Sequence, residues 1–174
     1  MGLDKLKDVR ALVSDVDGVM TKGEIYVGAA GETKIFSVRD GLGIKLLQKA
    51  GLEFALLSGR ASDPVRARAQ ELGIRSVKTG RIDKQVALRE IEREIGIPCH
   101  QMAYIGDDLP DLAPLAMVAV GFCPRNAVEE VRAAADLVVP IDGGNGVVRH
   151  VVEIILKAQG VWANCVSAFE VTHD

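Results

Sequence analysis

Short apolar runs alternate with amphipathic stretches along this chain of 174 residues. Runs that stay apolar from end to end are typical of strands buried on both faces, as in a parallel sheet. Five such runs lie at residues 9–13, 54–57, 102–105, 118–122 and 137–139. Residues 76–78 leave room for one more short strand. This alternation predicts βαβ units and an α/β fold.

The amphipathic stretches carry apolar residues at the 3.6-residue spacing of a helix. We expect helices over residues 41–50, 63–72, 84–95, 127–135 and 147–158. Ser62-Asp63-Pro64 is a start signal for the second of these helices, and Asn126 is the expected cap of the fourth. Together the strands and helices predict an open, Rossmann-like parallel sheet with helices on both faces.

One segment breaks the alternation directly after the first predicted strand. Residues 24–38 place two short stretches on either side of the loop Gly28-Ala29-Ala30-Gly31, which is typical of a β-hairpin. We therefore expect a single domain over residues 1–160, with a small hairpin inserted at residues 24–38. Residues 161–174 have no clear period, and we expect this tail to be mobile or to depend on a partner.

Composition narrows the functional class. Hydrophobic residues make up 48% of the chain and charged residues 26%, which excludes a disordered protein. The net charge of −3 offers no electrostatic footprint for nucleic acid. Cys99, Cys123 and Cys165 are widely spaced and predict neither a disulfide framework nor a zinc site. No apolar run approaches the roughly 18 residues of a membrane span. We expect a cytoplasmic protein with a small-molecule partner, without contacts to nucleic acid or membranes.

Polar motifs follow the predicted strands, at the edge where open α/β sheets bind ligands. Asp15 and Asp17 lie at i and i+2 where the first strand opens into a turn, so both carboxylates can converge on one site. A solvated turn explains this pair equally well. Ser58, with the backbone N–H groups that follow it, can form an anion-binding nest. When such a serine is considered alone, an ordinary turn at the end of a strand is the more common explanation.

A lysine and an acidic run complete the set. Lys84 opens a predicted helix, where a cation opposes the helix dipole, although an ordinary surface lysine is the alternative. Asp107, Asp108 and Asp111 lie within five residues. Helix capping explains one of them, but like charges repel unless a cation compensates. Because Mg²⁺ binds a few carboxylates together with water, the run predicts a magnesium site.

The ordered set D-x-D, Ser, Lys and G-D-D-x-x-D resembles the haloacid dehalogenase superfamily of phosphohydrolases, over about residues 11–111. The resemblance implies that Asp15 is a nucleophile that forms an aspartyl-phosphate. It implies that Asp17 is first a general acid and then a general base. The catalytic residues it implies are Asp15, Asp17, Ser58 and Lys84, the last two binding the phosphoryl oxygens. The Mg²⁺ ligands it implies are Asp15, Asp17 through its backbone carbonyl, and Asp107, with Asp108 in support.

The resemblance is to the capless class of this superfamily. The hairpin is too short for a folded cap, and residues 58–84 have room for only one helix and one strand. Members of the class assemble as tetramers with their hairpins packed centrally, which implies a homotetramer. The segments 37–41, 58–60 and 143–149 are similar to capless phosphatases that act on an eight-carbon sugar acid phosphate in lipopolysaccharide core biosynthesis, over about residues 9–160.

Such a substrate carries a phosphate and a carboxylate, and arginines bind carboxylates bidentately. The substrate contacts that the resemblance implies are Asp17, Ser37, Val38, Arg39, Asp40, Gly41, Lys45, Arg60, Arg68 and Lys84. For Arg68 a solvated helix face is the alternative. Lys22 departs from the pattern, which usually has an aspartate there. Two other functions stay open: a phosphatase for a nine-carbon, sialic acid type 9-phosphate, and a phospholigand-binding scaffold without catalysis.

Overall fold

The computed structural model describes residues 3–29 and 31–169, and its centre is a six-stranded sheet in which every neighbouring pair of strands is parallel. The strand order is β5-β4-β1-β6-β7-β8. The bounds are β1 (Ala11–Ser14), β4 (Glu53–Leu57), β5 (Ser76–Lys78), β6 (Met102–Ile105), β7 (Val120–Pro124) and β8 (Leu137–Val139). All six predicted strands are confirmed, with ends that differ by a few residues.

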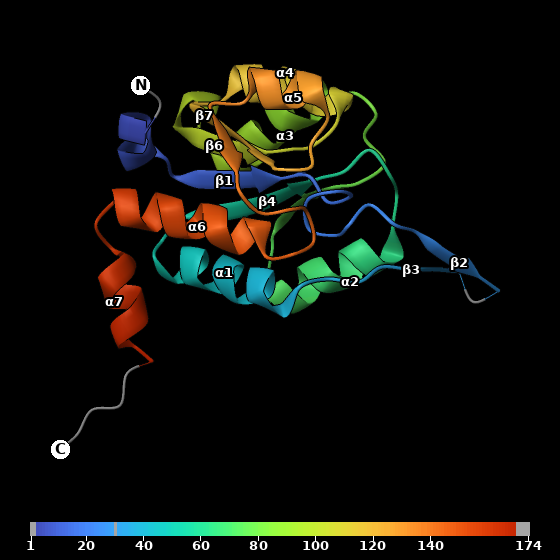
Figure 1. Ribbon diagram of the computed structural model, residues 1–174, viewed down its shortest axis with the longest axis horizontal. Coiled ribbons are helices and arrows are strands. Elements are labelled where there is room, and N and C mark those ends of the chain that lie inside the picture. Colours follow the sequence, from blue (N-terminus) through green and yellow to red (C-terminus); the bar gives the residue numbers. More distant parts are fainter. Residues whose placement is uncertain (1–2, 30, 170–174) are drawn as a thin grey trace.

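Helices cover both faces of this sheet, as predicted. In Figure 1, α3, α4 and α5 lie on one face, and α1, α2 and α6 lie on the other. The bounds are α1 (Val38–Lys49), α2 (Asp63–Leu72), α3 (Lys84–Ile95), α4 (Leu112–Met117), α5 (Glu129–Ala134), α6 (Val147–Ala158) and α7 (Trp162–Ser167). Three short 3₁₀ helices are η1 (Leu3–Asp8), η2 (Cys99–Gln101) and η3 (Leu109–Asp111). Each face of the sheet contributes to its own hydrophobic cluster.

Two helix starts differ from the sequence prediction. Helix α1 begins at Val38 because the Ser37 side chain caps it by accepting a hydrogen bond from the N–H of Asp40. The prediction that Asn126 caps the helix expected over residues 127–135 is wrong, since this helix, α5, begins later, after Val128. The Asn126 side chain instead accepts a hydrogen bond from the N–H of Gly143, 2.9 Å away. It therefore fastens a loop that lies against the carboxyl end of the sheet. Helix α4 was not predicted at all.

The hairpin consists of β2 (Tyr26–Gly28) and β3 (Gly31–Thr33), so its regular part is shorter than the predicted 24–38. Tyr26 pairs with Thr33, and the hairpin projects from the carboxyl end of the main sheet (Figure 1). Within the described residues between β1 and α1, these two strands are the only regular elements. No cap domain is therefore inserted there, as expected.

The end of the chain forms a short helix before the described residues stop at 169. Trp162 of α7 lies beneath two cations of α6, with Arg149 at 5.3 Å and Lys157 at 5.4 Å from its ring centroid. Cys165 is buried against α6 and its surroundings. The predicted mobility of residues 161–174 stays a prediction, and residues 170–174 lie outside the described part. Among the described helices, none is long and apolar enough to cross a membrane.

The sheet register explains why distant polar residues can meet. Ser14, the last residue of β1, pairs with Leu56 of β4 on one side and Ile105 of β6 on the other. The residues that follow these three strands therefore leave the sheet at the same edge. All four residues of β1 are buried, so the strand is held firmly between its neighbours.

Candidate active site

Three carboxylates meet at the carboxyl edge of the sheet. Asp15 follows β1, and Asp107 and Asp111 follow β6. One oxygen atom of each lies within 4.8 Å of the others. The predicted convergence of the first acidic motif with the second is therefore confirmed.

Lys84, the first residue of α3, neutralises part of this acidic cluster. Its Nζ donates hydrogen bonds to Oδ1 of Asp15 and Oδ1 of Asp111, each at 2.7 Å. Burial alone would lower the pKa of this lysine, but the two carboxylates raise it above its ordinary value. Lys84 therefore carries a fixed positive charge inside the site, although it opens a helix, where a cation is locally unfavourable.

Asp111 is the residue that the sequence prediction left without a role in the site. It is completely buried, and four hydrogen bonds fill its two oxygens. Oδ1 accepts from Lys84 and from the hydroxyl of Tyr104, which is 2.5 Å away. Oδ2 accepts from the N–H groups of Asp107 and Asp108. Asp111 therefore positions its neighbours and has little capacity left for a metal. Its place in the G-D-D-x-x-D motif was the only signal for it.

Asp107 has the free capacity that Asp111 lacks. Its Oδ1 is buried and has no hydrogen-bond partner among the residues that the structure describes. Burial first, and then the charges of Asp15 and Asp111, raise the pKa of Asp107 to about 8. Burial also raises the pKa of Asp15 to about 7, although Lys84 opposes the shift. The buried Asp15 and the half-buried Asp107 both resist ionisation, and Asp107 has one oxygen without a partner among the described residues, so the pair fits a hard divalent cation.

Gly18 allows this close arrangement of the two acidic segments. Its φ is +90°, which favours glycine, and an added Cβ would lie 1.9 Å from Oδ2 of Asp107. A side chain at this position would therefore displace Asp107. This explains why the motif continues D-x-D-G.

Asp108 lies outside the group of Asp15, Asp107 and Asp111, and its expected support of the metal stays a prediction. It is exposed, and its Oδ1 accepts a hydrogen bond from the N–H of Leu109 at 2.8 Å. With Asp111 it forms a capping box for η3. Helix capping, the alternative considered for one residue of this run, therefore accounts for Asp108.

Asp17 has a buried lysine of its own. Lys34, directly after β3, donates a hydrogen bond to Oδ1 of Asp17, and its Nζ lies 3.6 Å from Oε1 of Glu32. Glu32 also accepts from Arg60 at 2.9 Å and from Ser62 at 2.6 Å. Ion pairs and hydrogen bonds therefore link the hairpin to the loop that carries Asp17 and to the segment that follows Ser58. The sequence offered no signal for Lys34, because its burial depends on how the hairpin folds back.

Ser58 lies at the end of β4, the strand next to β1. It is buried, and its hydroxyl accepts from the N–H of Arg60 at 3.2 Å. This bond closes a tight turn of the kind that directs successive N–H groups outward. Arg60 itself is half exposed and its guanidinium contacts Glu32 instead of the acidic cluster.

The other predicted substrate contacts lie at the start of α1 and on α2. Asp40 is buried and accepts a hydrogen bond from the N–H of Arg149 at 2.8 Å, which places it at the start of α6. The guanidinium of Arg68 reaches the carbonyl of Ser37 at 3.4 Å and Glu71 at 2.7 Å. An added Cβ on Gly41 would lie 2.4 Å from that guanidinium.

Three more of these residues point to solvent-accessible positions. Val38 is exposed. Arg39 lines an open cavity of about 340 Å³ with Arg149 and His150. Lys45 is exposed on α1, with Gly73 near its ammonium. In the described contacts, none of the three touches the acidic cluster, so their part in substrate binding stays a prediction.

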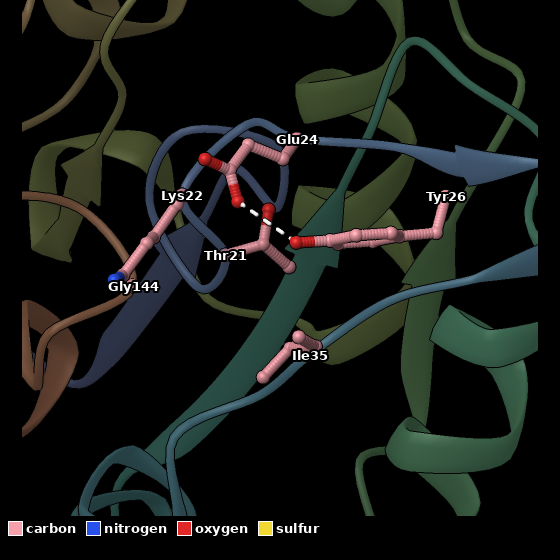
Figure 2. Close-up of a pocket in the computed structure, with 6 residues that line it drawn as sticks. All are labelled: Thr21, Lys22, Glu24, Tyr26, Ile35 and Gly144. Atoms are coloured by element: carbon pink, nitrogen blue, oxygen red, sulfur yellow. Dashed lines mark hydrogen bonds between the residues drawn. The ribbon is translucent and has the colours of Figure 1, made fainter.

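A small cavity lies beside the loop that carries Asp17. Its volume is about 150 Å³, and its lining is mixed in character: Thr21, Lys22, Glu24, Tyr26, Ile35 and Gly144. Figure 2 shows Tyr26 directed toward Glu24, with a hydrogen bond of 3.4 Å between them. The acidic cluster does not line this cavity.

Comparisons with known proteins agree with this geometry. Residues 73–151 match the family model of the haloacid dehalogenase-like hydrolases. The chain is 41% identical to the 3-deoxy-D-manno-octulosonate 8-phosphate phosphatase KdsC of Haemophilus influenzae, over 90% of this chain and 87% of that protein. It is 39% identical to the same enzyme of Yersinia pestis, over 90% and 84%.

Solved structures show the same likeness. The crystal structure of 3-deoxy-D-manno-octulosonate 8-phosphate phosphatase from Moraxella catarrhalis, in complex with a magnesium ion, a phosphate ion and a KDO molecule, matches with a TM-score of 0.93. Its identity to this chain is 40%, and the match covers 97% of both chains. The Yersinia pestis enzyme matches with a TM-score of 0.90 at 38% identity, over 93% of this chain and 88% of the other.

Proposed function

Because this chain belongs to the 3-deoxy-D-manno-octulosonate 8-phosphate phosphatases, within the haloacid dehalogenase-like hydrolases, we propose that it hydrolyses 3-deoxy-D-manno-octulosonate 8-phosphate in lipopolysaccharide core biosynthesis. The chain is a phosphoric monoester hydrolase. The observation that carries the proposal is the grouping of the buried Asp15 and Lys84 with the half-buried Asp107 at the carboxyl edge of the sheet. A relative with the same fold binds magnesium, phosphate and the sugar acid.

We propose that Asp15 and Asp107 hold Mg²⁺. These two carboxylates keep ligand capacity after the hydrogen bonds of the site are made, because Asp111 is already saturated. The backbone carbonyl of Asp17 is the further ligand that the family resemblance implies. A bound Mg²⁺ would neutralise the clustered carboxylates and the phosphoryl oxygens of the substrate.

The proposed chemistry has two steps, both carried by the loop after β1. An oxygen of Asp15 attacks phosphorus, the ester bond breaks, and Asp17 gives its proton to the departing alkoxide. Water then attacks the aspartyl-phosphate while Asp17 takes back a proton, which releases phosphate and restores Asp15. Lys84 and the turn at Ser58 would hold the phosphoryl oxygens throughout. Lys84 also keeps the attacking carboxylate in place, 2.7 Å away.

Arg60 is the group that we propose for the substrate carboxylate. It lies two residues beyond Ser58, and its guanidinium is half exposed. Glu32 accepts a hydrogen bond from Nη2 of Arg60, and the other N–H groups of that guanidinium can bind a second carboxylate. Arg39 and Arg68 stay proposed contacts from the start of α1 and from α2.

A panel of sugar acid phosphates tests the proposal. Phosphate release should be fastest with the eight-carbon substrate, should require a divalent cation, and should stop when a chelator is added. Equal or faster release from a nine-carbon 9-phosphate would favour the sialic acid type of phosphatase instead. Binding of phosphate and metal without any turnover would leave the chain as a phospholigand-binding scaffold.

A further inference from the structure

The buried lysine of the hairpin, Lys34, is an unusual feature for a surface element. Strand β2 is exposed, as are both ends of β3, yet the side chain of Lys34 is completely buried. An ammonium removed from water is unfavourable unless it is paired and hydrogen-bonded. Its two carboxylate neighbours in the described part of the chain are Asp17, which accepts its hydrogen bond, and Glu32.

Two buried lysines therefore serve the two carboxylates of one short motif. Lys84 arrives from α3 and holds Asp15, whereas Lys34 arrives from the hairpin and holds Asp17. The first lysine also contacts Asp111, so it belongs to the acidic cluster. The second lies outside that cluster, which contains Asp15, Asp107 and Asp111. Of the three carboxylates proposed to take part in the reaction, Asp15, Asp17 and Asp107, Lys34 therefore contacts Asp17 alone.

Building on the proposed function, we propose that Lys34 is a positioning residue that acts through Asp17. Its hydrogen bond uses Oδ1 of Asp17, and Oδ2, which has no hydrogen-bond partner among the residues described, can exchange a proton. In the first step that proton goes to the departing oxygen as the phosphorus–ester bond breaks and the bond from Asp15 to phosphorus forms. In the second step Asp17 accepts a proton from the attacking water as the bond from Asp15 breaks. A carboxyl group held at one oxygen stays aligned for both transfers.

Substrates with different leaving groups can distinguish a positioning role of Lys34 from a purely structural one. A sugar alkoxide needs the proton that Asp17 supplies, whereas a nitrophenolate leaves without it. Lys34→Met should therefore lower kcat/KM about 10²-fold for a sugar phosphate but less than about fivefold for p-nitrophenyl phosphate. Because the second step still needs Asp17, p-nitrophenyl phosphate should release a burst of about one nitrophenolate per site before slow turnover.

Three further variants sharpen the test. Lys34→Arg keeps the charge and the hydrogen bond, and should keep kcat/KM for the sugar phosphate within about tenfold of the parent. Lys22→Met removes an exposed lysine from the same loop as Asp17 and should leave the ratio between the two substrates unchanged. In an Asp17→Asn background, the further change Lys34→Met should cost less than about twofold.

Equal losses of kcat/KM on both substrates would overturn the proposal, as would an equal change of the ratio in Lys22→Met. So would a loss in the Asp17→Asn background as large as in the parent. If circular dichroism shows that Lys34→Met does not fold, Lys34→Gln takes its place with the same readings. Failure of the proposed function is visible separately, because the parent would then not hydrolyse the eight-carbon substrate. The comparison at Lys34 would then use any sugar phosphate that the parent does hydrolyse.

Discussion

At the level of single residues, the site depends on which carboxylate oxygens already have hydrogen-bond partners. Asp111 uses both of its oxygens to hold Lys84, Tyr104 and the backbone of its own motif. Asp107 keeps one buried oxygen without a partner among the described residues. The sequence showed that acidic residues cluster, but it could not show which of them is used up by hydrogen bonds and which keeps an oxygen for a metal. That division follows from the turn after β6, where the backbone N–H groups face Asp111.

The raised pKa values of this cluster predict that Mg²⁺ binding depends on pH. A metal ion needs deprotonated carboxylates, so protons compete with it below the pKa values of about 7 for Asp15 and about 8 for Asp107. Affinity measured by titration calorimetry should therefore rise at least about tenfold from about pH 6 to about pH 8.5. Asp107→Asn should weaken binding and flatten this dependence. An affinity independent of pH in the parent would contradict the assignment.

Asp15→Asn removes the proposed nucleophile while preserving its shape. Turnover of the sugar phosphate should fall at least about 10³-fold, which corresponds to about 4 kcal/mol of transition-state stabilisation. Asp142→Asn is the matched control, because Asp142 is paired with Arg125 at an exposed position. Steady-state phosphate release measures both variants. Full activity in Asp15→Asn would exclude the mechanism.

At the level of elements, α1 and α6 are joined more closely than most helix pairs. Gly43 of α1 lies so near α6 that an added Cβ would be 2.9 Å from the Cα of Arg149. Asp40, in the first turn of α1, accepts a hydrogen bond from the first turn of α6. Helix α6 and α3 were predicted with their exact bounds because both have a continuous apolar stripe. Helix α4, with six residues, is too short for such a stripe.

This junction predicts a stability that depends on pH. Burial raises the pKa of Asp40 from 3.8 to about 6, although backbone N–H groups of α6 oppose the shift. The folded state therefore binds this proton more tightly than the unfolded state. Asp40 contributes most stability below about pH 4, and this contribution is lost as pH rises through about 6.

Asp40→Asn stays neutral and should lack that loss. Relative to the parent, its free energy of unfolding should improve by up to about 3 kcal/mol between about pH 4 and about pH 7. Urea unfolding of both proteins at the two pH values measures this difference. Subtracting the parent's free energy of unfolding from that of Asp40→Asn removes the contribution of every group that titrates in the same way in both proteins. A difference that is the same at both pH values would show that Asp40 does not titrate as its burial implies.

At the level of the whole molecule, the strands and the parallel sheet were predicted from the sequence, whereas the strand order and the surroundings of the site come from the structure. Strands β1, β4 and β6 were predicted because each is an apolar run followed by a polar motif, and parallel strands bring those ends to one edge. The role of Lys34 could not be predicted from the sequence, because only the folded hairpin buries this lysine against Asp17. Asn126 was assigned to the wrong partner because a cap and a loop anchor use the same amide group.

The exposed hairpin supports the proposed homotetramer. Tyr26, Val27 and Ile35, on and beside the hairpin, are 53%, 80% and 68% exposed in the single chain, and a group of exposed apolar side chains marks a surface for protein contact. Light scattering should give the mass of four chains for the parent and a smaller mass for Val27→Asp. Val86→Asp, on the exposed side of α3, should leave the mass unchanged. A parent protein with the mass of one chain would contradict the proposal.

The central claim is that Asp15 carries the phosphoryl group between two steps. The most direct test is to quench the reaction with acid during turnover of 3-deoxy-D-manno-octulosonate 8-phosphate with Mg²⁺, and to locate the phosphoryl group by peptide mass spectrometry. The account predicts a phosphorylated peptide that contains Asp15 in the parent, and none in Asp15→Asn. A phosphoryl group on any other residue, or turnover that never yields an adduct on Asp15, would contradict it.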